Sequence, residues 1–198
     1  MVTVTLAIGA QRMLRREALI RKLPAVESLG SVTVICSDKT GTLTENKMTA
    51  VILDAADERL DISVVNNDMA ADRTAPELIA GNSSIHLLLA GSALCNDAVL
   101  KIQNDSAERF LAIGDPTEGA LVVAAARFDM DKYLLDKLFH RTAEIPFDSE
   151  RKRMTTVHRF PTDIPENLST LHSGWVDAIR NGSSAPYVAF TKGAVDGL

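Results

Sequence analysis

Apolar residues recur along the chain in patterns that predict a mixture of strands and helices. Short runs of β-branched, aliphatic or aromatic residues, bounded by turn formers, predict strands. Helical spacing of apolar residues predicts several amphipathic helices in the other segments. The expected strands are 32–35, 50–53, 60–65, 142–147, 154–160 and 187–190, and the expected helices are 1–23, 76–94 with a break at 81–83, 116–126, 133–139 and 168–180.

The order of these elements indicates an α/β chain in two parts. A buried strand at 32–35 that ends in turn formers is typical of a parallel sheet. The later strands form hairpin-like pairs, which favours an antiparallel sheet. We place the boundary between the two parts at about residue 50, where an acidic, polar region begins.

Composition narrows the class of protein. With 198 residues the chain can form one large domain or two small ones, and its net charge of −5 argues against general nucleic-acid binding. Five of the basic residues lie between positions 11 and 23. The two cysteines, Cys36 and Cys95, are expected to be reduced, buried thiols, as in a cytosolic protein. No apolar stretch approaches the ~18 residues of a membrane helix.

Asp38 is the strongest candidate for chemistry. It follows the predicted strand 32–35, and functional groups of open α/β sheets gather where strands end. A carboxylate held there can act as a covalent nucleophile. The alternative interpretation is an ordinary turn that begins with an aspartate, because Asp, Thr and Gly are common turn residues.

The heptapeptide Asp38–Thr44, DKTGTLT, resembles the phosphorylation signature of the P-type ATPases. The resemblance implies that Asp38 attacks the γ-phosphate of ATP. It also implies that Asp38 and the Thr40 carbonyl hold Mg²⁺, and that Lys39 and Thr42 line the phosphate site. A Rossmann-like phosphorylation domain of the haloacid-dehalogenase type is the fold expected around such a residue.

The N-terminal segment resembles the cytosolic end of the fourth membrane helix in type II P-type ATPases and its link to the phosphorylation domain. We therefore expect residues 1–22 to be this membrane-helix end and linker, 23–50 the first part of the phosphorylation domain, and 51–198 a nucleotide-binding domain that is incomplete at its C-terminus. The implied location is the cytoplasmic face of a membrane, with the lipid contacted by the parent protein.

Residues 114–121, GDPTEGAL, predict the start of a helix. Asp115 is a suitable N-cap, Pro116 suits the first helical position, and Glu118 completes a capping pattern without any further function. The octapeptide also resembles a segment of the P-type nucleotide-binding domain. That resemblance implies that Glu118 hydrogen-bonds the adenine amino group and that Thr117 lies close by.

Residues 147–154, FDSERKRM, predict a charged hairpin tip, which is usually only solvated. They also resemble a second motif of the nucleotide-binding domain. In that motif Phe147 would stack on adenine and Lys152 would approach the nucleotide. Ser149 departs from the arginine of some calcium pumps, so one cation that could reach phosphate is missing.

Residues 191–194, TKGA, follow the last predicted strand. The tripeptide Lys-Gly-Ala has little specificity alone, but its place after the other motifs resembles the family order. Lys192 would then be the pocket lysine that packs on adenine or reaches the phosphates. Gly193 would let the backbone come close to the ligand.

Together the motifs predict an internal fragment of a type II, calcium-pump-like cation pump that uses ATP and Mg²⁺. The transported cation would pass through membrane helices absent from this chain. The alternatives are a stand-alone nucleotide-binding or regulatory module and a haloacid-dehalogenase-type phosphatase. Thr40 counts against the phosphatase, because such enzymes usually have a second aspartate at that position. Lacking the family's Thr-Gly-Asp and Gly-Asp-Gly-x-Asn-Asp segments, the chain alone is expected to bind nucleotide weakly without turnover.

Overall fold

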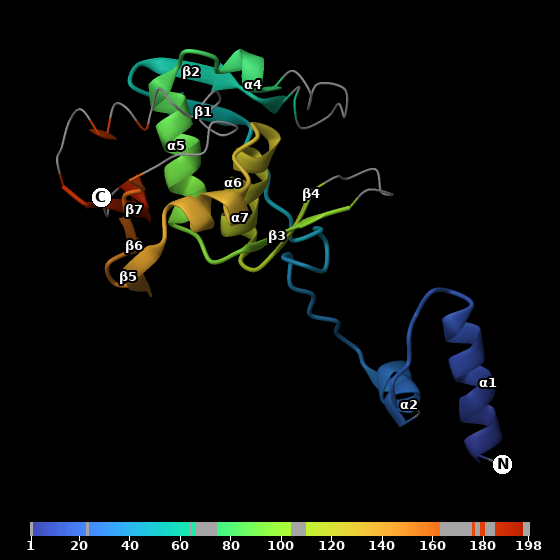
Figure 1. The fold of residues 1–198 in the computed structure, drawn as a ribbon. Coiled ribbons are helices and arrows are strands. Elements are labelled where there is room, and N and C mark those ends of the chain that lie inside the picture. Colours follow the sequence, from blue (N-terminus) through green and yellow to red (C-terminus); the bar gives the residue numbers. More distant parts are fainter. Residues whose placement is uncertain are drawn as a thin grey trace. The chain divides into compact units, whose positions relative to one another are not determined.

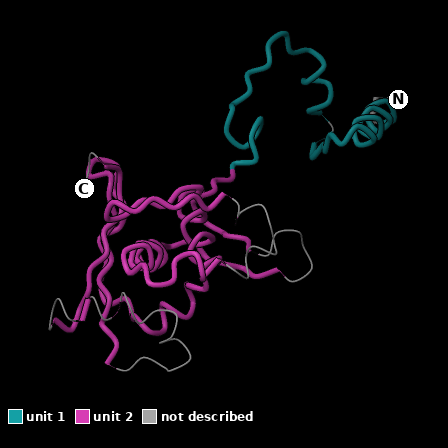
Figure 2. The backbone as a smooth tube through the Cα atoms, turned by 90° about the horizontal axis from the view of Figure 1, so that it is seen from above, with its two compact units in different colours: residues 1–46 teal, residues 47–198 magenta. Residues whose placement is uncertain are grey.

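The computed structural model describes residues 2–22, 24–63, 65, 75–103, 110–162, 176, 179–180 and 185–195. Its internal contacts divide the chain into two compact units, Met1–Asn46 and Lys47–Leu198, drawn in two colours in Figure 2. The assignment of 1–22, 23–50 and 51–198 to functional domains stays a prediction, and most of the helix expected at 168–180 lies outside the described residues.

Most helices and strands of the second unit follow the predicted order with shifted bounds, and the strand predicted at 60–65 runs instead over Glu58–Asp61 (Figure 1). The helices are α1 (Val2–Leu14), α2 (Pro24–Ser31), α4 (Ala75–Leu78), α5 (Ser83–Leu94), α6 (Pro116–Arg127) and α7 (Lys132–Leu138). The strands are β1 (Ile52–Ala55), β2 (Glu58–Asp61), β3 (Val99–Ile102), β4 (Phe110–Ile113), β5 (Arg141–Asp148), β6 (Arg153–Arg159) and β7 (Tyr187–Gly193). The sequence analysis did not predict the β3–β4 hairpin.

The first unit differs from its prediction. The helix expected at 1–23 ends at Leu14, and Pro24 begins the separate helix α2, because its fixed φ and missing N–H suit a first helical position. The strand predicted at 32–35 is wrong: Val34 and Ile35 are 73% and 79% exposed and form no strand. A strand needs a neighbour for its backbone groups, and the described residues of this unit contain no other strand.

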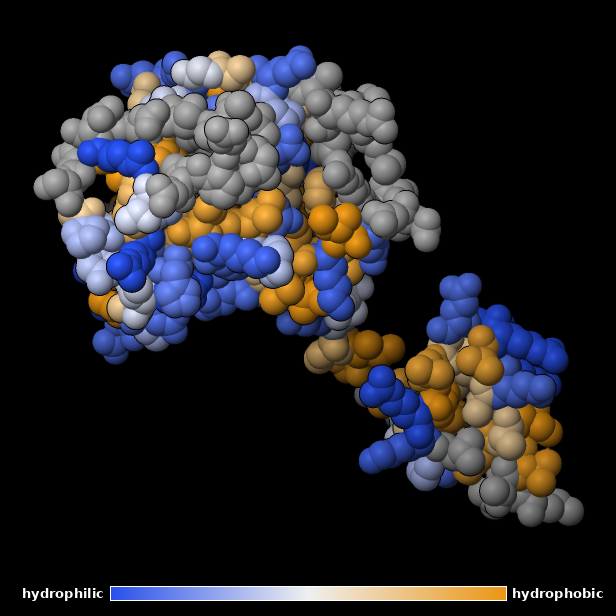
Figure 3. Space-filling view, viewed as in Figure 1, coloured by the Kyte–Doolittle hydropathy of each residue, from blue (hydrophilic) through white to orange (hydrophobic). Residues whose placement is uncertain are grey.

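The surface of the first unit is partly apolar. Val4, Ile8 and Leu14 of α1 are exposed, and Figure 3 shows the unit's apolar residues as orange patches. None of the helices among the described residues is long and apolar enough to cross a bilayer. Cys36 is exposed, which corrects the expectation of a buried thiol, because the strand that would have covered it is not formed.

The described residues of the second unit form three small antiparallel sheets, in line with the antiparallel sheet expected for this part. The sheets are the pairs β1–β2 and β3–β4 and a three-stranded sheet in the order β5–β6–β7. Strand β6 is central, with irregular register toward β5 and regular pairing with β7. The Rossmann-like phosphorylation domain remains a prediction.

Helix α5 organises the core of the second unit. It contacts β1, β7, α6 and α7, and its Ile85, Leu89 and Leu94 are buried. Gly91 lets the sheet come close, because a Cβ added there would lie 2.8 Å from a carbon of the Phe190 ring on β7. The helix thereby places the start of α6 near the three-stranded sheet.

His158 is a fully buried histidine on β6. Its Nδ1 lies 2.9 Å from the Phe139 carbonyl, which can only accept, so Nδ1 carries the proton. Nε2 then accepts from the Thr156 hydroxyl at 2.9 Å. Burial lowers the pKa of His158, and the positive charge of Arg141 adds to this, against the opposing hydrogen bond to Phe139.

We expect the second unit to lose stability as pH falls below the ordinary histidine range. The unfolded chain takes up a proton near pH 6.5, whereas folded His158 resists protonation, so the free energy of unfolding decreases as the pH falls through the ordinary histidine range. Urea midpoints across this range measure the effect. His158→Asn should flatten the dependence, while the exposed-site control His140→Asn should keep it. An equal slope in His158→Asn would contradict the assignment.

A second prediction concerns Gly193, which pairs with Arg153 at the end of β7. A Cβ at this glycine would lie 2.5 Å from the Lys152 carbonyl oxygen and 2.8 Å from the Arg153 Cβ. Gly193→Ala should therefore lower the free energy of unfolding by about 1–3 kcal/mol, the usual effect of overpacking. Gly30→Ala in α2 is the control, because nothing lies within 4 Å of its added Cβ. Denaturant unfolding followed by circular dichroism compares the two variants. Unchanged stability of Gly193→Ala would contradict the prediction, because the strands would then accommodate the added methyl group at no cost.

Candidate functional site

The start of α6 is built as its sequence predicts. Asp115 is the N-cap, and its Oδ1 accepts the N–H groups of Thr117 at 2.9 Å and Glu118 at 3.3 Å. Pro116 occupies the first turn of the helix. Asp115 alone thus satisfies two otherwise free N–H groups, and the Glu118 carboxylate is directed elsewhere.

Glu118 forms an ion pair with Lys192. The Lys192 Nζ lies 2.5 Å from Glu118 Oε1, and the two side chains are 22% and 17% exposed. The second oxygen, Oε2, accepts the Asp97 N–H at 3.1 Å. The fold thereby joins two motifs that lie 74 residues apart in the sequence.

The register of the three-stranded sheet brings further predicted residues to the same end. Lys192 pairs with Met154, and Gly193 pairs with Arg153, which follows Lys152. Lys152 is exposed, lies in the turn before β6 and accepts the Ala194 N–H through its carbonyl. Lys152, Lys192 and Gly193 therefore meet where β7 ends.

Phe147 reaches this end of the sheet from β5. It is 62% exposed and lies at the irregularity between Ile145 and Asp148, where β5 and β6 lose their regular register. Its ring therefore leaves an aromatic face open to a ligand. Thr117 is also exposed, but its hydroxyl donates to the Met48 sulfur at 3.4 Å.

The tip between β5 and β6 is a closed turn. Asp148 Oδ1 accepts the N–H groups of Glu150 at 3.0 Å and Arg151 at 2.8 Å. The backbone hydrogen bond from Arg151 is the main cause that lowers the pKa of Asp148. The tip thus has the geometry of an ordinary charged turn, and it places Lys152 at the start of β6.

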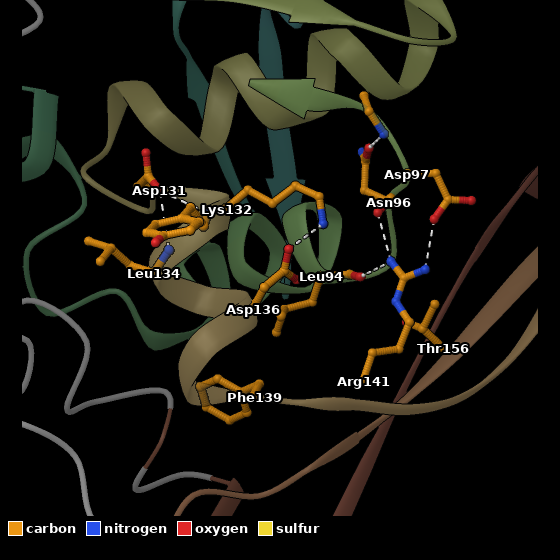
Figure 4. Close-up of polar contacts among 12 residues, drawn as sticks. Leu94, Asn96, Asp97, Asp131, Lys132, Leu134, Asp136, Phe139, Arg141 and Thr156 are labelled. Carbon is orange, nitrogen blue, oxygen red and sulfur yellow. Dashed lines mark hydrogen bonds and ion pairs between the residues drawn. The ribbon is translucent and has the colours of Figure 1, made fainter. Parts of the chain in front are cut away.

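Sequence reasoning did not single out Arg141, which lies beside this site. Its guanidinium binds Asp97 and Glu144 and the carbonyls of Leu94 and Asn96, as Figure 4 shows for its partners on the turn. Arg141 itself had no signal, because main-chain carbonyls leave no mark in a sequence.

A cavity of about 490 Å³ is lined in part by Arg141. Its lining comes from the turn after α5, from β3 and from α7, and neither Glu118, Phe147 nor Lys192 contributes to it. The residues are Asn96, Asp97, Ala98, Val99, Leu100, Asp131, Lys132, Tyr133, Asp136, His140 and Arg141. The ion-paired cluster and this cavity are therefore separate features.

The heptapeptide around Asp38 forms an exposed turn in the first unit. Asp38 Oδ1 faces the Thr40 N–H at 3.4 Å, and the Leu43 N–H donates to the Lys39 carbonyl at 3.0 Å. The side chains of Asp38, Lys39, Thr40 and Thr42 are exposed. The described geometry is that of an aspartate-initiated turn, without the preceding strand that we expected.

Oxygen ligands for a cation are few within this turn. Asp38 and Thr40 offer a carboxylate and a carbonyl, which suit Mg²⁺ when substrate phosphate and water complete its shell. Among the residues that the structure describes, no group of three or more His, Cys, Asp or Glu side chains could hold a metal ion. A cation here would thus depend on ligands from the substrate.

Known proteins resemble the chain along its whole length. It is 42% identical over 199 residues to calcium-transporting ATPase 1 of Bacillus cereus, covering 100% of this chain and 17% of that protein. It is 44% identical over 168 residues to the probable cation-transporting ATPase F of Mycobacterium bovis, covering 82% of this chain and 18% of that protein. For the bovine calcium-transporting ATPase type 2C member 1, identity is 41% over 171 residues, 83% of this chain and 17% of that protein.

The family model described as P-type ATPase, cytoplasmic domain N, matches residues 84–198. This range includes α6, the three-stranded sheet and the Glu118–Lys192 pair. The chain spans about a sixth of the length of these relatives. With more than half of its residues matched, the chain belongs to the P-type ATPase family, and its second unit carries that family's cytoplasmic domain N.

Proposed function

We propose that the chain is the ATP-binding and phosphorylation segment of an ATP-driven cation pump of the type II, calcium-pump-like class. The observation that carries the proposal is the contact between Glu118 and Lys192, which unites two separate family-like motifs in one partly buried pair. An ordinary helix cap would not require this pairing, since Asp115 caps α6 alone.

In the proposed nucleotide site each residue has a distinct role. Glu118 accepts a hydrogen bond from the adenine amino group, and Phe147 offers its open ring for stacking on the base. Lys192 and Lys152 supply positive charge toward the phosphates. Gly193 has no side chain, so the backbone at the end of β7 can come close to the ligand. Thr117 borders the site as an exposed residue at the start of α6.

The ion pair has a consequence for binding. Lys192 is already neutralised by Glu118 and is only 22% exposed, so a phosphate group must compete with a carboxylate for it. The second Glu118 oxygen, held by the Asp97 N–H, keeps the carboxylate in place while Lys192 turns toward the ligand. Adenine can then bind Glu118 while a phosphate group binds Lys192.

Asp38 is the proposed phosphoryl acceptor. A carboxylate oxygen attacks the γ-phosphorus of ATP, a new oxygen–phosphorus bond forms, and the bond to the β-phosphate oxygen breaks as ADP leaves. Lys39 and Thr42 line the phosphate site. Mg²⁺ bound by Asp38 and the Thr40 carbonyl would neutralise charge on the transferred group.

The proposed setting is the cytoplasmic face of a membrane, with ion transport performed by the parent protein. The names of the similar proteins support this, since they are calcium- or cation-transporting ATPases. Calcium is the proposed cation on the same basis.

We expect Phe147→Ala and Lys192→Ala each to weaken ATP binding by about 1–3 kcal/mol, the range of one stacking or charge-assisted contact. Isothermal titration calorimetry of the chain with ATP measures the change. The controls are Tyr187→Ala, an exposed aromatic at the opposite end of β7, and Lys101→Ala, an exposed lysine on β3. Unchanged affinity in both site variants, with folding intact, would remove the sheet end from the nucleotide site.

We expect Asp38→Asn to abolish phosphate incorporation in the full-length pump proposed to contain this segment, because an amide is a far weaker nucleophile than a carboxylate. Labelling with γ-³²P-ATP, followed by hydroxylamine, which cleaves acyl phosphates, measures the modification. Asp54→Asn is the control, as Asp54 is an exposed carboxylate on β1. Hydroxylamine-sensitive label that persists in Asp38→Asn would disprove the assignment.

A further inference from the structure

Arg141 is a partly buried arginine at the first position of β5, a strand whose other residues are exposed. Its side chain is 24% exposed. Nη1 lies 2.7 Å from Asp97 Oδ1 and 2.9 Å from Glu144 Oε2, and Nη2 donates to the carbonyls of Leu94 at 3.1 Å and Asn96 at 2.7 Å. Figure 4 shows the guanidinium pointing into the turn that follows α5.

The same turn, residues 94–97, also binds Glu118. The Asn96 side-chain amide donates to the Glu118 carbonyl at 2.9 Å, and the Asp97 N–H donates to Glu118 Oε2 at 3.1 Å. Asn96 is fully buried, and its Oδ1 accepts the Ala98 N–H at 2.8 Å. Both the backbone and the carboxylate of Glu118 therefore depend on the conformation of residues 94–97.

Packing does not hold this turn on all sides. The cavity of about 490 Å³ borders Asn96, Asp97 and Arg141, so this side of the turn is not packed against other side chains. The side chains of Asp97 and Glu144, which form ion pairs with Arg141, are about half exposed. Ion pairs at such exposed positions contribute little stability on their own. The two carbonyl contacts are therefore the ones that define the turn.

We propose that Arg141 is a positioning residue of the nucleotide site: its guanidinium clamps the turn 94–97, and the turn orients the Glu118 carboxylate for adenine. The inference rests on the proposed function, in which Glu118 reads the adenine amino group. A guanidinium suits this role because its planar fork of donors reaches two carbonyls and a carboxylate at once. A lysine keeps the charge but cannot bridge all of these acceptors.

Burial opposes the charge on Arg141, but Asp97 and Glu144 outweigh it and raise the pKa of Arg141. The clamp is thus charged at every pH at which the protein is folded. Ionisation of Arg141 should therefore add no pH dependence to its effect on Glu118.

The test measures base discrimination by the 198-residue chain. Calorimetry gives the affinities for ATP and for purine riboside triphosphate, which lacks the amino group. Arg141→Lys is expected to weaken ATP binding about tenfold and to leave the analogue nearly unchanged, as for a lost supporting contact. A merely structural defect would weaken both ligands equally, and that result would overturn the inference.

Two comparisons make the test specific. In a Glu118→Ala background, Arg141→Lys should have no further effect on ATP affinity, because the two residues act in series. Arg159→Lys, at the exposed end of β6, is the matched control and should leave both affinities unchanged. Additive effects of Arg141→Lys and Glu118→Ala would contradict the clamp.

The outcomes also separate this inference from the proposed function. If Glu118→Ala leaves the preference for ATP intact, the proposed nucleotide site fails, and the clamp fails with it. If Glu118→Ala removes the preference and Arg141→Lys does not, only the clamp is wrong. Should Arg141→Lys unfold, Arg141→Gln takes its place, because its amide cannot reach both the Leu94 and the Asn96 carbonyl; a retained preference in that variant would overturn the clamp.

Discussion

The second unit depends on an ion pair between two side chains that are largely withdrawn from water. Glu118 comes from the first turn of α6 and Lys192 from the end of β7, and each is about one-fifth exposed. A partly buried charge needs a partner, because removing one member leaves the other desolvated and unbalanced. The helix N-terminus further favours the carboxylate. The pair therefore constrains how α6 and the sheet approach each other.

The rest of the unit makes this approach possible. Helix α5 lies against both α6 and β7, and Gly91 lets it sit close to Phe190. The turn after α5 then binds Glu118 through Asn96 and Asp97. A helix, a turn and a sheet thus converge on one carboxylate, which explains how an exposed end of a small sheet can hold a defined charged group.

The two units differ in how their chemistry is supported. In the second unit Lys192 pairs with Glu118, 74 positions away, and Arg141 with Asp97, 44 positions away. In the first unit Asp38 and its neighbours are exposed, and their hydrogen bonds to described residues lie within their own turn. A nucleophilic carboxylate gains its reactivity from surrounding charges and ligands, so the role proposed for Asp38 rests on the sequence motif rather than on local geometry.

Local interactions were readable from the sequence. The cap by Asp115, the break before α5 and the strands of the three-stranded sheet depend on neighbouring residues and on short periodic patterns, and the structure confirms them. The pairing of β3 with β4 was not predicted, because two four-residue strands carry little signal. The apolar run at 32–35 was misread, because the same residues suit a strand only when another strand lies beside them.

Tertiary structure alone decided where the functional side chains point. The sequence determined that Glu118 lies in the first turn of a helix, but it left open whether the side chain caps that helix or binds adenine, and it gave no sign of the pairing with Lys192. Arg141 and its carbonyl partners were invisible, since backbone oxygens are the same in every residue. Sequence patterns record which residues follow one another, whereas a site depends on contacts across dozens of residues, and only the folded chain brings those atoms within bonding distance.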